Sequence, residues 1–317
     1  MTRTGAVLDG AGILVASTTA AAQPRVVFDG DAYLVAWAGS DGVHSQRIGA
    51  GTGALLGAGN TLYVGCARNV DLGRDAVGVL LVIEDCTAQL LAQRAGVAGA
   101  VGGPVTISPP MVPTARPRIA WNGSEWLVAF EELIAVPSLG PVFLDRGNVY
   151  TERLSITLAA LDPQPIAIAV SKSNESTPLV ASDGRDFFVA WSRLYADEHG
   201  HPAGVYARVV SADGTAGEAT QLVNGPAEGR SVVWDGMRYA VAYAIDRGDF
   251  THELYLTHGG DRIPISAAWP EQRDVALAAA GGTLRAAYAR VAIEPAYGGV
   301  FRVFVREIAG RRRVAGR

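Results

Sequence analysis

The sequence predicts an all-β protein, a six-bladed β-propeller with four antiparallel strands per blade and an N-terminal strand that completes the last blade. Three observations predict this fold. One short pattern recurs along the chain, each copy has the residues of a β-hairpin, and the two chain ends each supply part of one blade. All-β rings often form one domain at this length, so we expect a single domain over all 317 residues.

The repeated pattern is a β-rich run, usually an Asp-Gly or Asn-Gly pair, and a second run that usually ends in an aromatic residue. Such self-similarity is typical of repeat architectures. The pattern is clear at 24–37, 117–130, 179–191 and 231–243, and weaker at 68–83 and 274–288. The six copies predict blades that begin near residues 24, 66, 117, 178, 230 and 273.

Each copy supplies the first two strands of a blade. Asp-Gly and Asn-Gly are strong signals for a tight hairpin, because the primed turn needs a positive φ. The aromatic residues that end the second runs are expected in the core between blades: Trp37, Phe130, Trp191, Tyr243 and Tyr288. Two further strands usually follow, as at 205–210 and 220–223, and four strands make a blade.

The chain ends predict how the propeller closes. Residues 4–15 read like the turn and fourth strand of a blade, but the first three strands do not precede them. The last copy has its third strand at 300–307 and then lacks a fourth. We therefore expect residues 1–17 to close the last blade, with the strand itself at 12–16.

The pattern resembles the bacterial propeller repeats with a hydrophobic-x-Asp-Gly-x-x-Tyr-Leu-Val-Ala-Trp signature, found in actinobacterial and myxobacterial proteins. Residues 27–37 carry this signature most completely, and the resemblance covers nearly the whole chain. It implies a propeller fold. It does not imply a reaction, because propellers include lectins, scaffolds, lyases, hydrolases and oxidoreductases.

The composition limits the classes of partner that we expect. The net charge of −4 gives no reason to expect a nucleic acid, and no run of about 18 apolar residues predicts a membrane span. The first 22 residues superficially resemble a signal peptide, but Asp9 interrupts their apolar stretch. We expect a cytoplasmic monomer, with secretion as the alternative.

Cys66 and Cys86 flank the first hairpin of the second blade. Their positions predict Cα atoms within about 7 Å of each other, the outer limit for a disulfide. A disulfide and two reduced thiols both remain open.

One candidate site follows from aligning the six copies. The position that opens the first strand of each copy reads Arg25, Arg68, Arg118, Leu179, Ser231 and Asp274. First strands line the central channel, so three consecutive blades would present an arginine at the channel mouth. Arginine suits carboxylate and phosphate groups. We expect a small anionic molecule there; the alternative is a structural network with Asp274, Glu131 and Glu132.

A second set of candidates lies on loops between second and third strands. One long loop, 131–147, begins with Glu131 and Glu132, and another, 192–203, contains Arg193, Tyr195, His199 and His201. His44 and His252 fall on or beside the same predicted face. Histidine is the natural acid–base group near neutral pH. The candidate catalytic residues are His44, His199, His201, His252, Glu131 and Glu132, and the candidate substrate-binding residues are Arg25, Arg68, Arg118, Arg193, Asp274 and Tyr195.

No metal or cofactor is expected. The pair His199-x-His201 is a weak metal signal, since alternate side chains of an extended segment point in opposite directions. Unequal blades favour an enzyme with one asymmetric pocket, doing acid–base chemistry such as elimination, isomerisation or cyclisation on a carboxylate-bearing molecule. The alternative is a protein-interaction scaffold or a lectin. The residues shared between blades are turn and core positions, which disfavours a multivalent lectin.

Overall fold

A computed structural model describes residues 13–16, 22–109, 112–134, 146–247, 252–266, 272–291 and 301–308. The secondary structure of this part of the chain consists of β-strands, with no helix. Contacts divide the chain into two compact units, Met1–Val170 and Ser171–Arg317, called unit 1 and unit 2. Each unit is described by itself.

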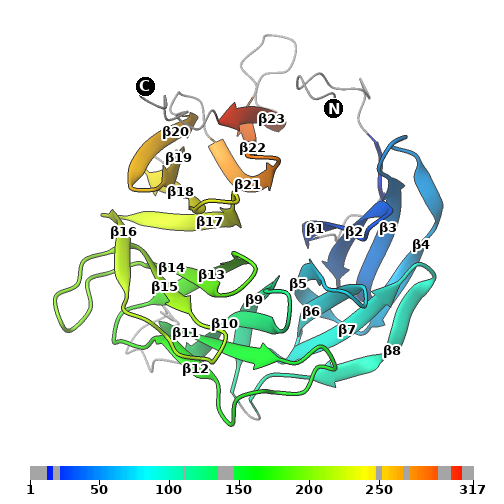
Figure 1. Cartoon of the computed structure of the whole chain (residues 1–317), viewed down its shortest axis with the longest axis horizontal. Coiled ribbons are helices and arrows are strands. Elements are labelled where there is room, and N and C mark those ends of the chain that lie inside the picture. The colour runs from blue at the N-terminus through cyan, green and yellow to red at the C-terminus, as the bar shows by residue number, and fades with distance from the viewer. Residues whose placement is uncertain are drawn as a thin grey trace, which may run out of the picture. The chain divides into compact units, whose positions relative to one another are not determined.

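Unit 1 contains three four-stranded antiparallel sheets, blades 1 to 3 (Figure 1). Blade 1 consists of β1 (Ala22–Phe28), β2 (Ala32–Gly39), β3 (Gly42–Gly49) and β4 (Leu55–Val64). Blade 2 consists of β5 (Ala67–Arg74), β6 (Val79–Asp85), β7 (Leu90–Gly96) and β8 (Gly99–Thr106). Blade 3 consists of β9 (Thr114–Trp121), β10 (Trp126–Ile134), β11 (Arg146–Leu154) and β12 (Ile166–Ala169).

Unit 2 contains blades 4 to 6, also antiparallel. Blade 4 consists of β13 (Glu175–Ser182), β14 (Phe187–Arg193), β15 (Gly204–Val210) and β16 (Thr220–Asn224). Blade 5 consists of β17 (Ala227–Trp234), β18 (Tyr239–Asp246), β19 (His252–His258) and β20 (Asp261–Ser266). Blade 6 has three described strands, β21 (Gln272–Ala280), β22 (Thr283–Val291) and β23 (Phe301–Ile308).

The predicted fold class is confirmed: the chain is a six-bladed β-propeller. Every predicted blade start lies within three residues of the first residue of β1, β5, β9, β13, β17 or β21. In unit 1, β1 contacts β5 and β5 contacts β9; in unit 2, β13 contacts β17 and β17 contacts β21. The first strands of neighbouring blades therefore lie side by side within each unit, as Figure 1 shows.

The closing strand stays a prediction. The described residues 13–16 have no strand conformation, and blade 6 gains no fourth strand from the part of the chain that the structure describes. Residues 1–12 and 17–21 lie outside the described residues. The single domain likewise stays a prediction. As a separate finding, no helix in the described ranges is long and apolar enough to cross a membrane.

The aromatic residues that end the second strands do form core contacts. In five blades the register places this residue opposite a ring on the third strand, and the paired ring centroids are 5.8–6.4 Å apart. Phe130, Trp191 and Tyr243 are fully buried, whereas Trp37 and Tyr288 are partly buried. Ring pairs of this geometry add to the free energy gained by burial alone. The five pairs are Trp37–His44, Phe130–Tyr150, Trp191–Tyr206, Tyr243–Tyr255 and Tyr288–Phe304.

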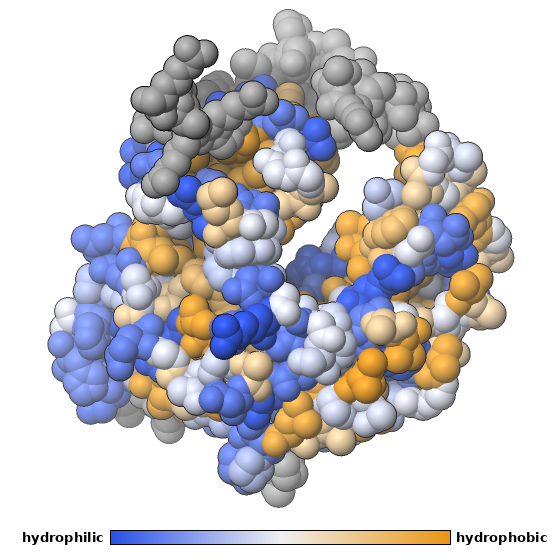
Figure 2. Space-filling view, in the orientation of Figure 1, coloured by the Kyte–Doolittle hydropathy of each residue, from blue (hydrophilic) through white to orange (hydrophobic). Residues whose placement is uncertain are grey.

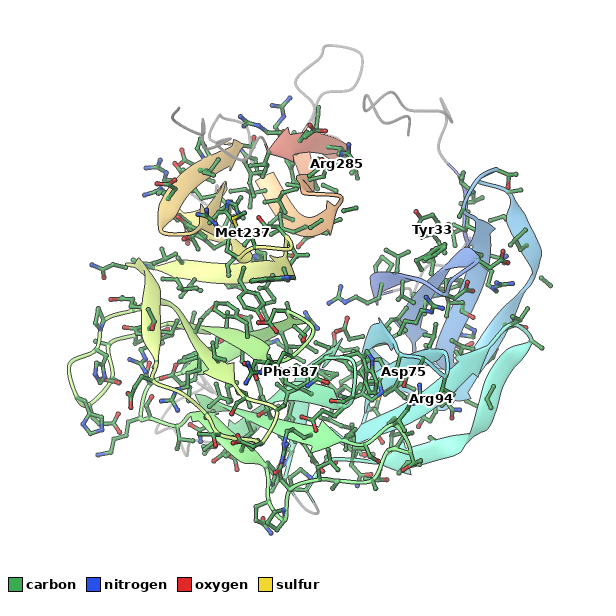
Figure 3. The ribbon with its side chains drawn as sticks, in the orientation of Figure 1. Tyr33, Asp75, Arg94, Phe187, Met237 and Arg285 are labelled. Carbon is green, nitrogen blue, oxygen red and sulfur yellow. A yellow bond between two sulfur atoms is a disulfide. The ribbon has the colours of Figure 1, made fainter. Side chains whose placement is uncertain are left out.

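The aspartate of the hairpin turn has a second function in the fold. Asp75 accepts hydrogen bonds from the backbone N–H groups of its own turn and from Arg94 on β7, 2.7 Å away, and the two lie side by side in Figure 3. Burial alone raises the pKa of Asp75, but the bonds from Arg94 and the turn outweigh it and lower that pKa. Asp29 pairs with Arg47 in the same way, and Asp235 with His258. The turn is thereby fastened to the third strand.

The outer strands β4 and β8 of blades 1 and 2 expose apolar side chains. Leu55, Val64, Val101 and Val105 are all exposed, and apolar residues are visible over these strands in Figure 2. Neither strand contains a charged residue. These two outer strands are therefore the apolar edge of blades 1 and 2.

Candidate functional site

The strand register corrects the predicted arc of arginines. Arg25 lies opposite Ala36 and Arg118 lies opposite Ala129, each the fourth residue of its second-strand motif. In blade 2 the residue opposite the matching Val82 is Asp71, three positions after Arg68. Arg68 is exposed on a bulge and makes no hydrogen bond or ion pair with any described residue. The repeat therefore presents Arg25, Asp71 and Arg118.

Asp71 links the three blades of unit 1. One carboxylate oxygen accepts a hydrogen bond from Arg25 Nε at 3.1 Å, and the other accepts one from the backbone N–H of Ile119 at 3.0 Å. Asp71 lies on β5, between β1 and β9, so its side chain ties both neighbouring first strands to blade 2. Arg25 therefore fits the alternative of a structural network, but its partner is Asp71 and not Asp274, Glu131 or Glu132.

Arg118 differs from Arg25. Its guanidinium is partly buried and donates to the carbonyl oxygen of Pro117 at 2.8 Å, with no ion pair within 4 Å among described residues. Burial lowers the pKa of Arg118, the charge of Asp71 raises it, and the charge of Arg25 lowers it. Arg118 is thus a cation held near a second cation and only partly compensated by acids.

Glu131 and Glu132 lie within β10, not at the start of a loop. Glu131 is 1% exposed and accepts a hydrogen bond from Arg116 at 2.7 Å, while Glu132 accepts one from Asn148 at 3.0 Å. The described ends of the predicted loop, 131–134 and 146–147, belong to strands, and residues 135–145 lie outside the described residues. Both glutamates are therefore bonded to side chains of blade 3.

The first strand of blade 3 contains a bulge at Arg116, and the buried carboxylate of Glu84 binds the backbone there. Arg116 has a φ of 52°, and equivalent residues Thr177 and Asp274 have φ values of 50° and 43°. The backbone N–H of Arg116 is captured by the buried carboxylate of Glu84 in blade 2, at 2.9 Å. Asn69 donates to the same oxygen. This network stabilises a backbone conformation that L-residues rarely adopt.

In unit 2 the structure brings together part of the second predicted set. Arg193, at the end of β14, donates through Nε to Glu175 at 2.8 Å and lies 2.9 Å from a carboxylate oxygen of Asp197. Glu175 is fully buried and also accepts hydrogen bonds from Trp191 and Ser171. The guanidinium of Arg193 is thereby held rigidly at the base of the loop that joins β14 to β15.

Asp197 connects this buried network to a histidine on the surface. Its side chain is 2% exposed, yet it lies 2.7 Å from Nδ1 of His201, whose side chain is 59% exposed. Burial alone raises the pKa of Asp197. The hydrogen bonds from the His201 side chain and backbone, with the charge of Arg193, outweigh burial and lower it to about 2. Asp197 is therefore ionised at neutral pH and orients the imidazole of His201.

Of the remaining predicted residues, His199 is the one with a described hydrogen bond to Asp197 or His201: its backbone N–H donates to Asp197 at 3.0 Å. His199 is exposed on the same loop, with its ring centroid 6.2 Å from that of His201, and Tyr195 is exposed beside them. His252 begins β19, and its Nδ1 is buried without a partner among described residues. Asp274 is an exposed bulge residue; the register puts Ala276 at the position predicted for it.

His44 occupies a position that the repeat itself explains. It lies opposite Trp37, at the third-strand position that carries Tyr150, Tyr206, Tyr255 or Phe304 in other blades. Its two ring nitrogens lie within hydrogen-bond distance of Asp41 and Thr61. The imidazole of His44 thus takes the place of the aromatic ring that four other blades have at this position, whereas blade 2 has Leu91.

Cys66 and Cys86 form a disulfide with Cα atoms 5.4 Å apart, so the predicted proximity is confirmed. The described residues contain no group of three or more His, Cys, Asp or Glu side chains that could hold a metal ion.

No protein-family model and no curated protein matches the chain. Among solved structures, it is similar to a puromycin-hydrolyzing peptidase of Mycobacterium tuberculosis, with a TM-score of 0.54 and 16% identity, covering 90% of this chain and 44% of that one. It is also similar to a neuraminidase-like protein of A/flat-faced bat/Peru, with a TM-score of 0.55 and 10% identity, covering 90% of this chain and 86% of that one. A mutant of AofleA from Arthrobotrys oligospora has a TM-score of 0.54 and 9% identity to this chain, and the match covers 90% of this chain and 82% of that one.

The chain spans less than half the length of the peptidase. At these identities the similarities show the fold, which is the β-propeller, and no activity. The argument for a function must therefore come from the side chains of this chain.

Proposed function

We propose that this propeller is an enzyme that performs general acid–base catalysis, with His201 as the group that transfers protons and Asp197 as the residue that positions it. One observation carries the proposal: an exposed imidazole lies 2.7 Å from a buried carboxylate that is itself held by Arg193. A histidine needs this arrangement to present one ring nitrogen in a fixed direction and tautomer.

The electrostatics support this assignment. The lowered pKa of Asp197 keeps it ionised across the neutral range, so it accepts from Nδ1–H of His201. Nε2 is then the nitrogen left to accept or donate a proton at the exposed edge of the ring. A positioned general acid or base contributes typically 10²- to 10⁴-fold to a rate.

The proposed reactions are elimination, isomerisation or cyclisation of a small carboxylate-bearing molecule. They need proton transfer and no protein nucleophile. Tyr195 and Leu194, both exposed on the same loop, offer apolar surface for the body of such a substrate.

The test uses solvent deuterium. The protein is incubated in D2O with a panel of small hydroxy-, amino- and keto-carboxylates, and loss of C–H signals is followed by proton NMR. We expect His201→Gln to slow exchange at least 100-fold. His199→Gln, on the same loop and more exposed, is the matched control and is expected to keep the wild-type rate. Asp197→Asn is expected to lower kcat with little change in KM. No exchange on any panel member, or equal rates for His201→Gln and wild type, would overturn the proposal.

A second candidate is a small-anion site on the first strands of unit 1, favoured by the partly buried and incompletely paired guanidinium of Arg118. Citrate binding measured by calorimetry tests it, and Arg68→Met is the matched control because it removes an exposed charge from the same region. Arg118→Met is expected to weaken binding at least tenfold, about 1.4 kcal/mol, and Arg68→Met less than twofold. Equal losses would assign the effect to net charge alone and contradict the site.

A further inference from the structure

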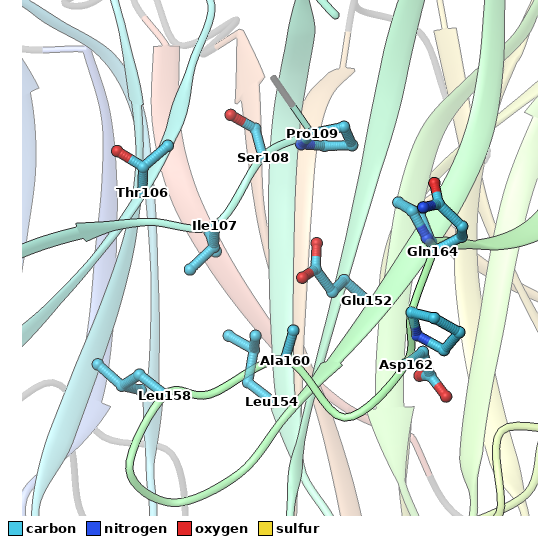
Figure 4. Close-up of a pocket in the computed structure, with 12 residues that line it drawn as sticks. Thr106, Ile107, Ser108, Pro109, Glu152, Leu154, Leu158, Ala160, Asp162 and Gln164 are labelled. Atoms are coloured by element: carbon cyan, nitrogen blue, oxygen red, sulfur yellow. The ribbon is translucent and has the colours of Figure 1, made fainter.

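A pocket of about 250 Å³ lies in unit 1 between the end of β8 and the loop that joins β11 to β12 (Figure 4). Its lining combines polar side chains, such as Thr106, Ser108 and Gln164, with an apolar part that includes three proline rings, Pro109, Pro163 and Pro165. The other apolar lining residues are Ile107, Leu154, Leu158 and Ala160. This volume is below the usual range for drug-sized ligands, so the pocket suits a small molecule.

One carboxyl group in this pocket has no partner among the residues that the structure describes. Glu152, on β11, is partly buried, and its side chain makes no hydrogen bond or ion pair with any described residue. The second acid, Asp162, is paired: it accepts two hydrogen bonds from Arg153, at 2.9 and 2.6 Å. Glu152 is therefore the group available to a ligand, as its position among the lining residues of Figure 4 illustrates.

We propose that this pocket binds a small organic ammonium ion with an apolar body, with the ammonium group against the carboxylate of Glu152. A partly buried carboxylate gains most from a cation that can both pair with it and donate hydrogen bonds. None of the described residues that line the pocket has a cationic side chain. The proline and leucine side chains provide the surface on which a compact hydrocarbon ring is buried.

The charges around Glu152 support a cation rather than an anion. Burial and, as a smaller cause, the negative charge of Asp162 together raise the pKa of Glu152 to about 7. Asp162 and Glu152 are the titratable groups in the lining, and Arg153, with its partners Asp162 and Glu125, packs behind them. An anion would meet two acids, whereas an ammonium ion would relieve the repulsion between them.

The first experiment compares three ligands of one shape and different charge: cyclopentylamine, cyclopentanol and cyclopentanecarboxylate. Binding to the full chain at pH 8 is measured by calorimetry. The amine is expected to bind at least tenfold more tightly than the alcohol, and the carboxylate is expected not to bind. Absence of amine binding, or equal affinities for amine and alcohol, would overturn the proposal.

The second experiment identifies the residue. Glu152→Gln is expected to reduce amine affinity at least tenfold, while Glu218→Gln, which removes an exposed carboxylate in unit 2, leaves it unchanged. Near pH 7, binding is also expected to release part of a proton from Glu152, seen as a buffer-dependent enthalpy that Glu152→Gln abolishes. An unchanged buffer dependence in that variant would show that the amine binds elsewhere.

Discussion

Replacing Glu152 with glutamine is expected to stabilise the protein at pH 8 and to have much less effect at pH 4. In the folded chain the pKa of Glu152 is raised to about 7 by burial and by Asp162, whereas in the unfolded chain it returns to its ordinary value near 4.5. Between these two values the folded state holds a proton that the unfolded state has lost. Stability therefore falls as pH rises through this window and levels off above pH 7.

The magnitude follows from the pKa difference. At 1.36 kcal/mol per pKa unit the cost of ionising Glu152 in the folded state is at most about 3.4 kcal/mol. Solvent screens a partly exposed carboxylate, which leaves about 1–2 kcal/mol. Glutamine has nearly the same shape and no charge, so the variant should gain this amount at pH 8 relative to its value at pH 4.

Urea denaturation of wild type and Glu152→Gln between pH 4 and pH 8.5 measures the effect. The informative quantity is the change with pH in the difference between the two free energies of unfolding, because other titrating groups and any packing defect of the amide cancel in it. Glu218→Gln, at an exposed site, is expected to show no such change. A constant difference for Glu152→Gln across the range would refute the raised pKa.

Three further predictions concern stability, each read by urea denaturation. Asp71→Ala is expected to cost about 2–3 kcal/mol, because it removes the partner of Arg25 and leaves the N–H of Ile119 unpaired; a loss below 0.5 kcal/mol would contradict the bridging role. Serine at both Cys66 and Cys86 is expected to cost about 3 kcal/mol, since the disulfide closes a loop of some 20 residues. His258→Arg is expected to be nearly neutral and His258→Ala to cost about 1 kcal/mol, because arginine holds the turn aspartate in blades 1 and 2; the reverse order would be inconsistent.

Blade boundaries were predictable from the sequence because turn chemistry and aromatic periodicity are local properties. The register of blade 2 was not, because that blade ends its second strand with Ile83 instead of an aromatic residue and has no Asp-Gly pair at the turn. A signal was nevertheless present: Asp75 precedes the first residue of β6 by four positions, as Asp29 precedes Tyr33. When the blades are aligned on Asp75 and Asp29, the residue of blade 2 that is equivalent to Arg25 is Asp71, not Arg68.

The loop of blade 4 was only partly predictable. His201 and Arg193 were assigned to the site, but Asp197 was not singled out among the loop acids. In an irregular loop, a spacing of four residues does not fix the distance between two side chains, whereas in a helix or strand it does. Glu175 was missed for a different reason: it lies at the far end of the hairpin formed by β13 and β14, and its pairing with Arg193 depends on the bulge between Ser176 and Leu179.

Repetition separates structural from functional histidines in this propeller. A residue whose position carries equivalent chemistry in other blades is explained by the fold: His44 replaces a tyrosine in a ring pair, and His258 replaces an arginine bound to a turn aspartate. Among the residues that the structure describes, His201 has no such counterpart, since its loop is longer than the equivalent turns of blades 1 and 2. Arg193 beneath it has a counterpart in Arg290 of blade 6, since each lies over the ring on its third strand. The contact between Asp197 and His201, and not the network below it, is therefore the strongest reason to test His201 first.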